Sequence, residues 1–448
     1  MLEIQPTANT SIGLAFVLLI LLGFLLGLGR RLEPAIRLEQ IGIPIALVAG
    51  LCGLILGPYG FLPVLPQGVT DIWTELPSPL LTLVFGTLLI GRPLPKGKGL
   101  VQPVASQALL GLLLGFGQYL VGGLVVIFFL IPFQGVDPLM GCLIEVGFEG
   151  GHGAAAVMGD SFQKLGFLAG KDLGLAMATV GLLASTIIGS LLVVLGRLKG
   201  WGVNRLETLP ATSSLLEESD VINLSHRFRQ LAVNLALPGL AVGFAVLMLN
   251  LLRSLSPFFG DIYEQVWTTF PVFPLALLGS LLVRFALERL EQTEIVSHVV
   301  QREIGTLCTD LLIITAMASI NLPILIADWV PITALSLAGL IWNLTVMLFF
   351  SKLIFNIEWF ERSLTEFGNA TGVAASGLLL LRLADPRSNT NALPVFSIKQ
   401  LFVQPLLSGG VITVLAPIGI INFGLMGWTE ISGVITFLFF IIAILIRQ

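Results

Sequence analysis

Two glycine-rich stretches interrupt apolar sequence in this chain: Glu149-Gly150-Gly151-His152-Gly153 and, about half a chain length later, Phe367-Gly368-Asn369-Ala370-Thr371-Gly372. Lipid offers no hydrogen-bond partners to bare peptide groups, so such breaks persist within a membrane only where protein or a water-filled cavity surrounds them. Matched breaks in the two halves of a chain are typical of a carrier's binding site. The pair therefore predicts a solute site formed by two chain breaks.

The composition identifies a polytopic membrane protein. Hydrophobic residues make up 55% of the chain and charged residues 11%, and the mean hydropathy is +0.96. The net charge of -4 is small and the basic residues are scattered, which excludes a nucleic-acid-binding surface. The three cysteines, Cys52, Cys142 and Cys308, lie in apolar stretches without metal-ligand spacing, so they read as small core residues.

Apolar runs of membrane-spanning length predict eleven helices. The predicted spans are 11–29, 41–57, 78–91, 103–131, 173–196, 230–252, 271–287, 306–327, 331–351, 398–421 and 429–446. The first is interpreted as an uncleaved span because Met1 to Thr10 contain no Lys or Arg, unlike a secretory signal.

Two further segments, about 138–164 and 361–387, contain apolar pieces too short to cross a membrane. Each is predicted to be a re-entrant hairpin that enters the membrane and returns to the same side. With the N-terminus outside and the C-terminus inside, this topology places every Lys and Arg of the 23 inside except Lys164, Lys171 and Arg253. Such an asymmetry follows the positive-inside rule, and a full crossing by either hairpin would destroy it.

The topology also contains an internal repeat, so the predicted fold is all-α with two inverted repeats of five spans, each with a re-entrant hairpin, plus one extra C-terminal helix. The expected divisions are an N-terminal repeat over 1–200, a polar cytoplasmic linker over 201–226, a C-terminal repeat over 227–421 and the additional helix over 422–448.

The chemistry is expected at the breaks. A helix that restarts at Gly153-Ala154, or at Thr371-Gly372, offers unpaired N-H groups and a positive dipole end to a carboxylate. Carbonyl oxygens freed near Gly150-Gly151 and Gly368-Asn369 could hold Na+. Asn369 and Thr371 add polar side chains within the second break.

Ionisable residues inside a membrane are costly and usually functional. Glu149 lies on the first break and is interpreted as a partner for a cation, an ammonium group or a proton; Glu145 lies one helical turn earlier. His152 could donate to an anionic substrate or simply cap the restarted helix. Arg382 could bind a carboxylate with Asp385 beside it, or both could form a local ion pair at the cytoplasmic mouth. No zinc site is predicted.

The run Asp137-Pro138-Leu139-Met140-Gly141 followed by Gly150-Gly151-His152-Gly153 resembles the first hairpin of the bacterial sodium/glutamate symporter family. Ile43-Pro44, Phe270-Pro271 and Phe367-Gly368 occur in the expected order. The resemblance implies an Na+-coupled carrier of L-glutamate in the cytoplasmic membrane, a homodimer in which a transport domain moves against a scaffold and no cofactor is used. It assigns Gly150, Gly151, His152, Gly153, Phe367 and Gly368 to the site.

Two departures from the family bear on the substrate. Glu149 stands where a small hydroxyl residue is common, and Ala370-Thr371-Gly372-Val373 lacks the usual Thr-Pro pair. A negative Glu149 repels a dicarboxylate unless Na+, a proton or the substrate's ammonium neutralises it. The alternatives are therefore an Na+- or H+-coupled carrier of another small carboxylate or amino acid and, from another class, a channel or membrane sensor. An enzyme is not expected, because no nucleophile and base pair has usable spacing.

The predicted site can be stated residue by residue. Substrate-binding residues are Gly151, His152, Gly153, Ala154, Asn369, Thr371, Gly372, Arg382 and Asp385; ion-binding residues are Glu149, Gly150, Phe367 and Gly368.

Overall fold

A computed structural model describes residues 20–29, 31, 45–64, 71–73, 75–90, 100–202, 224–386 and 390–447. Within these ranges the regular structure is entirely helical. Five helices are long and apolar enough to cross a membrane: Val101–Gln134, Gly170–Lys199, Ala232–Ser254, Trp329–Ile354 and Val411–Leu445. The chain is thus a helical multi-pass membrane protein, as its composition predicted.

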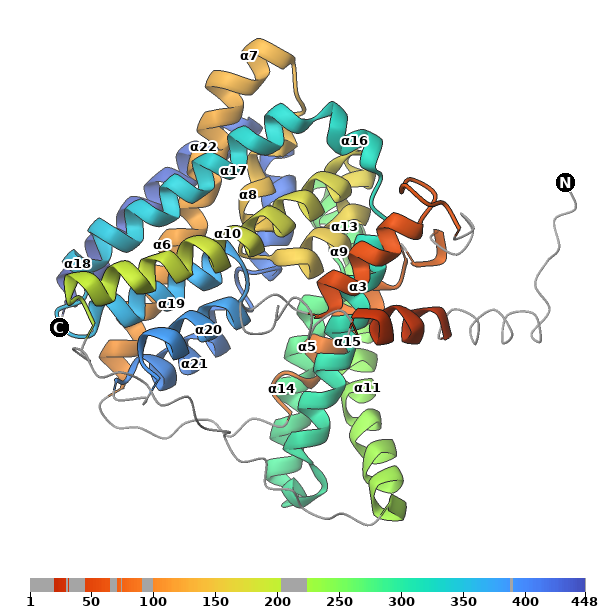
Figure 1. The fold of residues 1–448 in the computed structure, drawn as a ribbon. Helices are drawn as coiled ribbons and strands as arrows, with labels where there is room; N and C mark the ends of the chain where they lie inside the picture. The colour runs from red at the N-terminus through yellow and green to blue at the C-terminus, as the bar shows by residue number, and fades with distance from the viewer. Residues whose placement is uncertain are drawn as a thin grey trace, which may run out of the picture.

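One group of helices, here called the lateral bundle, packs at one side of the molecule (Figure 1). It consists of α3 (Ile45–Leu56), α5 (Pro77–Thr87), α11 (Leu224–Ser254), α14 (Phe273–Arg289) and α15 (His298–Ala318). Small residues allow its backbones to approach closely. A Cβ on Gly53 of α3 would lie 2.8 Å from the Cβ of Ala318 in α15.

A second group, the hairpin bundle, surrounds the two sequence breaks (Figure 1). Its long helices are α6 (Val101–Val125), α10 (Gly170–Lys199), α17 (Trp329–Thr345) and α22 (Val411–Leu445). The helix α6 lies at its centre, because it packs against α17, α22 and parts of both segments that contain the breaks.

Both breaks separate the arms of helical hairpins. The first comprises η2 (Pro138–Cys142), α8 (Leu143–Gly147) and, after the break, α9 (Gly151–Lys164). The second comprises α19 (Trp359–Thr371) and α20 (Ala374–Ala384), which pack against each other. Asp137 starts the first hairpin, because its Oδ1 accepts a hydrogen bond of 2.8 Å from the Leu139 N-H and Pro138 occupies the first helical position.

The helix before each hairpin contains a π-helical segment of five residues. In the first half, η1 (Val126–Leu130) follows α6 and leads into α7 (Ile131–Gln134). In the second half, η4 (Val346–Phe350) follows α17 and leads into α18 (Ser351–Ile354). Such segments are rare and frequently mark functional regions. Their recurrence gives the two halves a common order of elements up to the hairpins.

Several predicted spans differ from the helices observed. The predicted span 398–421 is wrong as one helix: α21 (Ala392–Val403) ends before a loop over 404–410, and α22 then runs through the predicted boundary at 421 with a kink at Gly424. The predicted span 306–327 is likewise divided between α15 and α16 (Leu322–Ala327). Residues 11–19 of the first span and 203–223 of the predicted linker lie outside the described residues.

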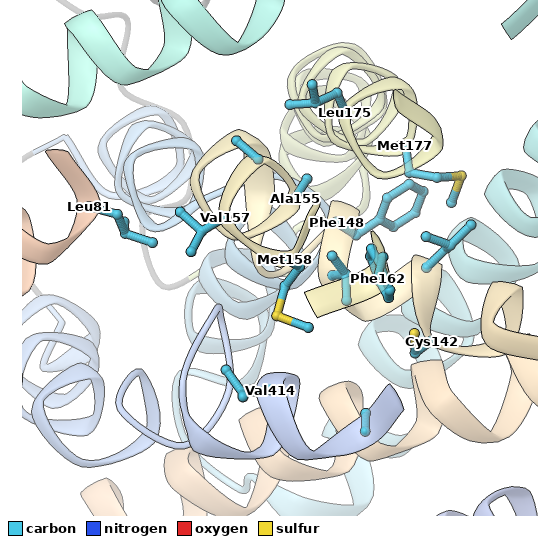
Figure 2. Close-up of a cluster of buried hydrophobic side chains, with 14 of the residues drawn as sticks. Leu81, Cys142, Phe148, Ala155, Val157, Met158, Phe162, Leu175, Met177 and Val414 are labelled. Atoms are coloured by element: carbon cyan, nitrogen blue, oxygen red, sulfur yellow. The ribbon is translucent and has the colours of Figure 1, made fainter. Parts of the chain in front are cut away.

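Further short elements near the lateral bundle are α12 (Ser256–Phe259), α13 (Asp261–Thr269) and η3 (Thr293–Ile295), and the described residues also include an apolar helix over Ile20–Gly29. The hairpin bundle meets the lateral bundle along α9. A Cβ on Gly153 would lie 3.2 Å from Leu81 of α5 and 3.8 Å from Leu312 of α15. Figure 2 shows Val157 of α9 facing Leu81 within the same buried cluster. This part of the boundary is apolar.

Candidate functional site

The two hairpin breaks touch each other. Gly151 has a φ of +64°, which an L side chain adopts with strain, and its backbone turns the chain into α9. A Cβ on Gly151 would lie 2.8 Å from Cγ1 of Val373, the extended residue in the second break. The structure therefore brings together two segments that are more than 200 residues apart in sequence.

One helix, α10, supports both breaks. A Cβ on Gly181 would collide with the Thr371 carbonyl oxygen and would lie 2.7 Å from the Phe148 ring. His152 Nε2 is 3.1 Å from Thr179 Oγ1 on the same helix. Because Gly181 has no side chain, α10 can lie directly against both breaks.

Both helices that follow the breaks begin without a side-chain cap. The residues at their N-caps are Gly150 for α9 and Val373 for α20, and neither supplies a side-chain hydrogen bond. The first N-H groups of a helix have no partner within it, and they carry its positive dipole end. Two such ends next to each other form an environment suited to carboxylate groups.

Polar side chains near the second break are buried with hydrogen-bonding atoms left over. Asn369 Nδ2, Ser376 Oγ and Gln118 Oε1 have no hydrogen-bond partner within the described ranges. Each such atom costs free energy of about 1–3 kcal/mol if it stays unpartnered, so a bound solute would gain by meeting it. Asn369 and Ser376 belong to α19 and α20, the two arms of this hairpin.

The end of α19 is fixed in place from the neighbouring helices. Gln118 Nε2 donates to the Ala370 carbonyl oxygen at 2.7 Å, and Asn343 Nδ2 donates to the same oxygen at 3.2 Å and to Thr371 Oγ1 at 3.0 Å. Gln118 of α6 and Asn343 of α17 thus form interhelical hydrogen bonds to α19. They hold the second break at a defined position.

The second break is two residues long and falls later than predicted. Phe367, Gly368, Asn369 and Thr371 are still helical, and the chain leaves the helix at Gly372. The Gly368 carbonyl oxygen accepts the Gly372 N-H at 3.0 Å, and a Cβ on Gly368 would lie 2.6 Å from the Gly377 Cα. Gly368 therefore packs the two arms together, and Phe367 is fully buried in an apolar cluster.

Two acidic residues of the first hairpin differ in how well they are partnered. Glu145 Oε2 accepts from Tyr119 OH at 2.5 Å, and its Oε1 accepts from Thr413 Oγ1 at 2.8 Å and Ser408 N at 3.1 Å. Glu149 is 3% exposed; its Oε1 accepts one hydrogen bond of 3.2 Å from Ser408 Oγ. Its Oε2 has no partner among the residues placed by the structure.

Several other predicted residues have different surroundings. Gly150 N donates to the Glu145 carbonyl oxygen at 2.8 Å, and Ala154 lies beside Gly409 in the 404–410 loop. Arg382 is exposed in the last turn of α20, and Asp385 accepts hydrogen bonds from the Thr390 N-H and hydroxyl at 2.9 and 2.6 Å. The structure does not bring these two residues to the breaks, because α20 separates them from Val373.

Sequence reasoning missed a buried ion pair. Lys399 Nζ of α21 lies 2.9 Å from Glu366 Oε2 of α19, and both side chains are fully buried. Gln107 Nε2 of α6 donates to Glu366 Oε1 at 2.9 Å. Lys399 and Arg362, which the predicted topology counts among the inside residues, are both buried in the hairpin bundle. The available signal was a lysine and a glutamate within apolar surroundings.

Broken helices that meet inside a helical membrane protein are the architecture of secondary transporters. The chain belongs to the sodium/glutamate symporter family, whose model matches residues 13–357. The match includes the first hairpin and ends just before α19. No curated protein gives a significant match to the chain.

Proposed function

We propose that this protein is a secondary active transporter that carries L-glutamate together with Na+ across the cytoplasmic membrane. The observation that carries the proposal is the contact between the two breaks, Gly151 against Val373, with an uncapped helix beginning at each. L-Glutamate has two carboxylates, and one can bind at each helix start. The family match supports both glutamate and Na+ as the transported pair.

The polar atoms near the breaks suit the rest of the solute. Asn369 Nδ2 can donate to a carboxylate oxygen, and Gln118 Oε1 can accept from the ammonium group. Glu149 Oε2 is buried and lacks a hydrogen-bond partner among the described side chains, so it can serve as an anionic ligand when the coupling ion binds beside it. His152, held by Thr179, is a further donor beside the first break.

The movement we propose is alternating access, with the hairpin bundle as the transport domain and the lateral bundle as the scaffold. The π-helical segment before each hairpin supports two related halves, which we interpret as inverted repeats with re-entrant hairpins. The topology we propose has the N-terminus outside and the C-terminus inside, as the lysine and arginine distribution indicates. A homodimer of such units would fix the scaffolds relative to one another.

The decisive experiment is uptake of labelled L-glutamate by purified protein in liposomes under an inward Na+ gradient. We expect accumulation that stops when choline replaces Na+ or when an ionophore collapses the gradient. Gradient-independent equilibration would instead indicate a channel, and binding without any flux would indicate a sensor. Absence of uptake with intact, monodisperse protein would falsify the glutamate assignment.

A second candidate is a carrier of another small carboxylate or amino acid, coupled to H+ through Glu149. The family match ends at residue 357, before α19 and α20, so the second hairpin can differ from that of the family and select another substrate. Competition of uptake by aspartate, glutamine, succinate and citrate at fixed Na+ separates the two candidates. A pH gradient that drives uptake without Na+ would favour the second.

A further inference from the structure

Two buried carboxylates, one from each hairpin, lie against the same face of α6. A Cβ on Gly115 would be 3.0 Å from Glu149 Oε2, and a Cβ on Gly111 would be 3.4 Å from Glu366 Oε2. Gly111 and Gly115 are one helical turn apart, a rise of about 6 Å. The carboxylates of the two hairpins are therefore close neighbours on a strip of α6 that lacks side chains.

The two carboxylates are held in the same way. In each, Oε1 accepts a hydrogen bond from a neutral side chain: Gln107 Nε2 at 2.9 Å for Glu366, and Ser408 Oγ at 3.2 Å for Glu149. In each, Oε2 faces a glycine of α6. The neutral donor fixes the carboxylate and leaves its second oxygen directed at the glycine strip.

The two carboxylates differ in what meets Oε2. At Glu366 the ammonium group of Lys399 lies 2.9 Å away, packs against Gly111 and also donates to Gln400 Oε1 at 3.3 Å. At Glu149 no protein atom within the described ranges forms a hydrogen bond to Oε2, even though the residue is almost fully buried, with 3% of its surface exposed. Leu407 lies beside the same position, with its Cδ1 2.5 Å from a Cβ on Gly115.

A buried carboxylate without a cation is strongly disfavoured. Glu366 meets this requirement with an ammonium group bonded to it, whereas Lys399 acts on Glu149 only through a longer-range charge interaction and leaves Oε2 open to a cation or a proton from solution. The unpartnered, buried Oε2 of Glu149 marks where that cation binds, and the Glu366–Lys399 pair shows the geometry one turn away.

We propose that the glycine strip of α6 carries two cation positions, of which the Lys399 ammonium permanently fills the one at Glu366 while Na+ binds at the one at Glu149. The proposal rests on the proposed Na+-coupled function and deepens it, because it limits the Na+ that these two carboxylates bind to one per chain. The Lys399 ammonium at the Glu366 position is a cation covalently attached to the chain. It is connected to the second break through Gln400, whose Nε2 donates to Asn369 Oδ1 at 2.7 Å.

The test is equilibrium binding of ²²Na+ to purified protein without substrate, with choline chloride as the balancing salt. For the wild type we expect one saturable Na+ per chain at this strip, lost in Glu149→Gln. In Lys399→Met the freed Glu366 should bind a second Na+, which raises the stoichiometry by one. The double variant Glu366→Gln/Lys399→Met should return to the wild-type stoichiometry.

Unchanged stoichiometry in Lys399→Met, or unchanged Na+ binding in Glu149→Gln, overturns the proposal. If Lys399→Met is recovered folded from NaCl but not from choline chloride, that rescue is itself the expected result. If Lys399→Met cannot be recovered folded from either salt while the double variant folds, Na+ cannot replace the Lys399 ammonium at Glu366. Lys399 then only neutralises Glu366, and the proposal fails. Wild-type Na+ binding with this pattern but without glutamate uptake would refute the glutamate assignment while leaving the two cation positions intact.

Discussion

Gly151 and Val373 join the two hairpins at their breaks: a Cβ added to Gly151 would lie 2.8 Å from Val373 Cγ1. The contact has no room for a side chain, and the φ of +64° at Gly151 adds strain of about 1–2 kcal/mol for any L residue other than glycine. The shape of the proposed solute site therefore depends on this glycine.

Replacing Gly151 by Ala is expected to reduce Na+-driven glutamate uptake by at least about tenfold, equivalent to about 1.4 kcal/mol, because the breaks must separate to admit the methyl group. Initial rates in liposomes measure the effect. The matched control is Gly243→Ala in α11, where an added Cβ meets nothing within 4 Å. Equal rates for both variants would show that contact between the breaks is irrelevant to transport.

Replacing Gly115 by Ala is expected to weaken Na+ activation. The new methyl group would lie 3.0 Å from Glu149 Oε2 and 2.5 Å from Leu407 Cδ1, so it would occupy the space in which we place the ion. We expect the Na+ concentration for half-maximal uptake to rise about tenfold, with a smaller change in the maximal rate. Gly239→Ala in α11 is the control, and identical Na+ curves for the two variants would exclude an ion beside Gly115.

Glu145 and Glu149 are expected to respond differently to replacement by Gln. Glu145 accepts three hydrogen bonds, so Glu145→Gln should lower the free energy of unfolding by about 1–3 kcal/mol. Glu149→Gln should have the same stability in NaCl as in choline chloride, because it lacks the carboxylate through which Na+ stabilises the wild type. Thermal unfolding in detergent, measured in both salts, tests the contrast; the opposite pattern would exchange the structural and ion-binding roles of the two residues.

Substrate affinity is expected to depend on Asn369 and Ser376 but not on Arg382. Asn369→Ala and Ser376→Ala each remove a buried polar atom that has no partner in the described structure, so the KM for glutamate should rise several-fold. Arg382→Ala changes an exposed residue at the far end of α20 and should leave KM unchanged. A large KM effect in Arg382→Ala alone would relocate the carboxylate-binding group to the end of α20.

The sequence predicted the helical membrane class and the two interruptions because apolarity and glycine runs are local signals. It placed the second break over Phe367–Gly372, whereas the helix continues to Thr371. Glycine has two uses that a sequence does not distinguish: Gly151 turns the chain at positive φ, but Gly368 lets two helical arms approach. The role of Gly368 becomes clear only from the residue that it faces across the hairpin, Gly377.

The buried ion pair was not predictable from local pattern. Glu366 and Lys399 are 33 residues apart and on different helices, so no helical spacing relates them. Lys399 resembles the charged end of a span when α21 is assumed to begin near residue 398, but α21 begins at Ala392. The buried position of Arg362 was not predictable either, since its partner Gln107 belongs to α6 in the other half of the chain.

The boundary between the two bundles has an apolar part along α9 and a hydrogen-bonded part at the start of α10. Along α9, Gly153 and Val157 meet Leu81 through dispersion contacts, which re-form at low cost after a shift. At the start of α10, Asp172 Oδ1 accepts the Asn321 N-H at 2.9 Å and Lys171 Nζ lies 3.4 Å from Ser319 Oγ. Sliding of the two bundles would have to break these hydrogen bonds. We therefore expect the start of α10 to act as a hinge, about which the hairpin bundle rotates relative to the lateral bundle rather than translating along it.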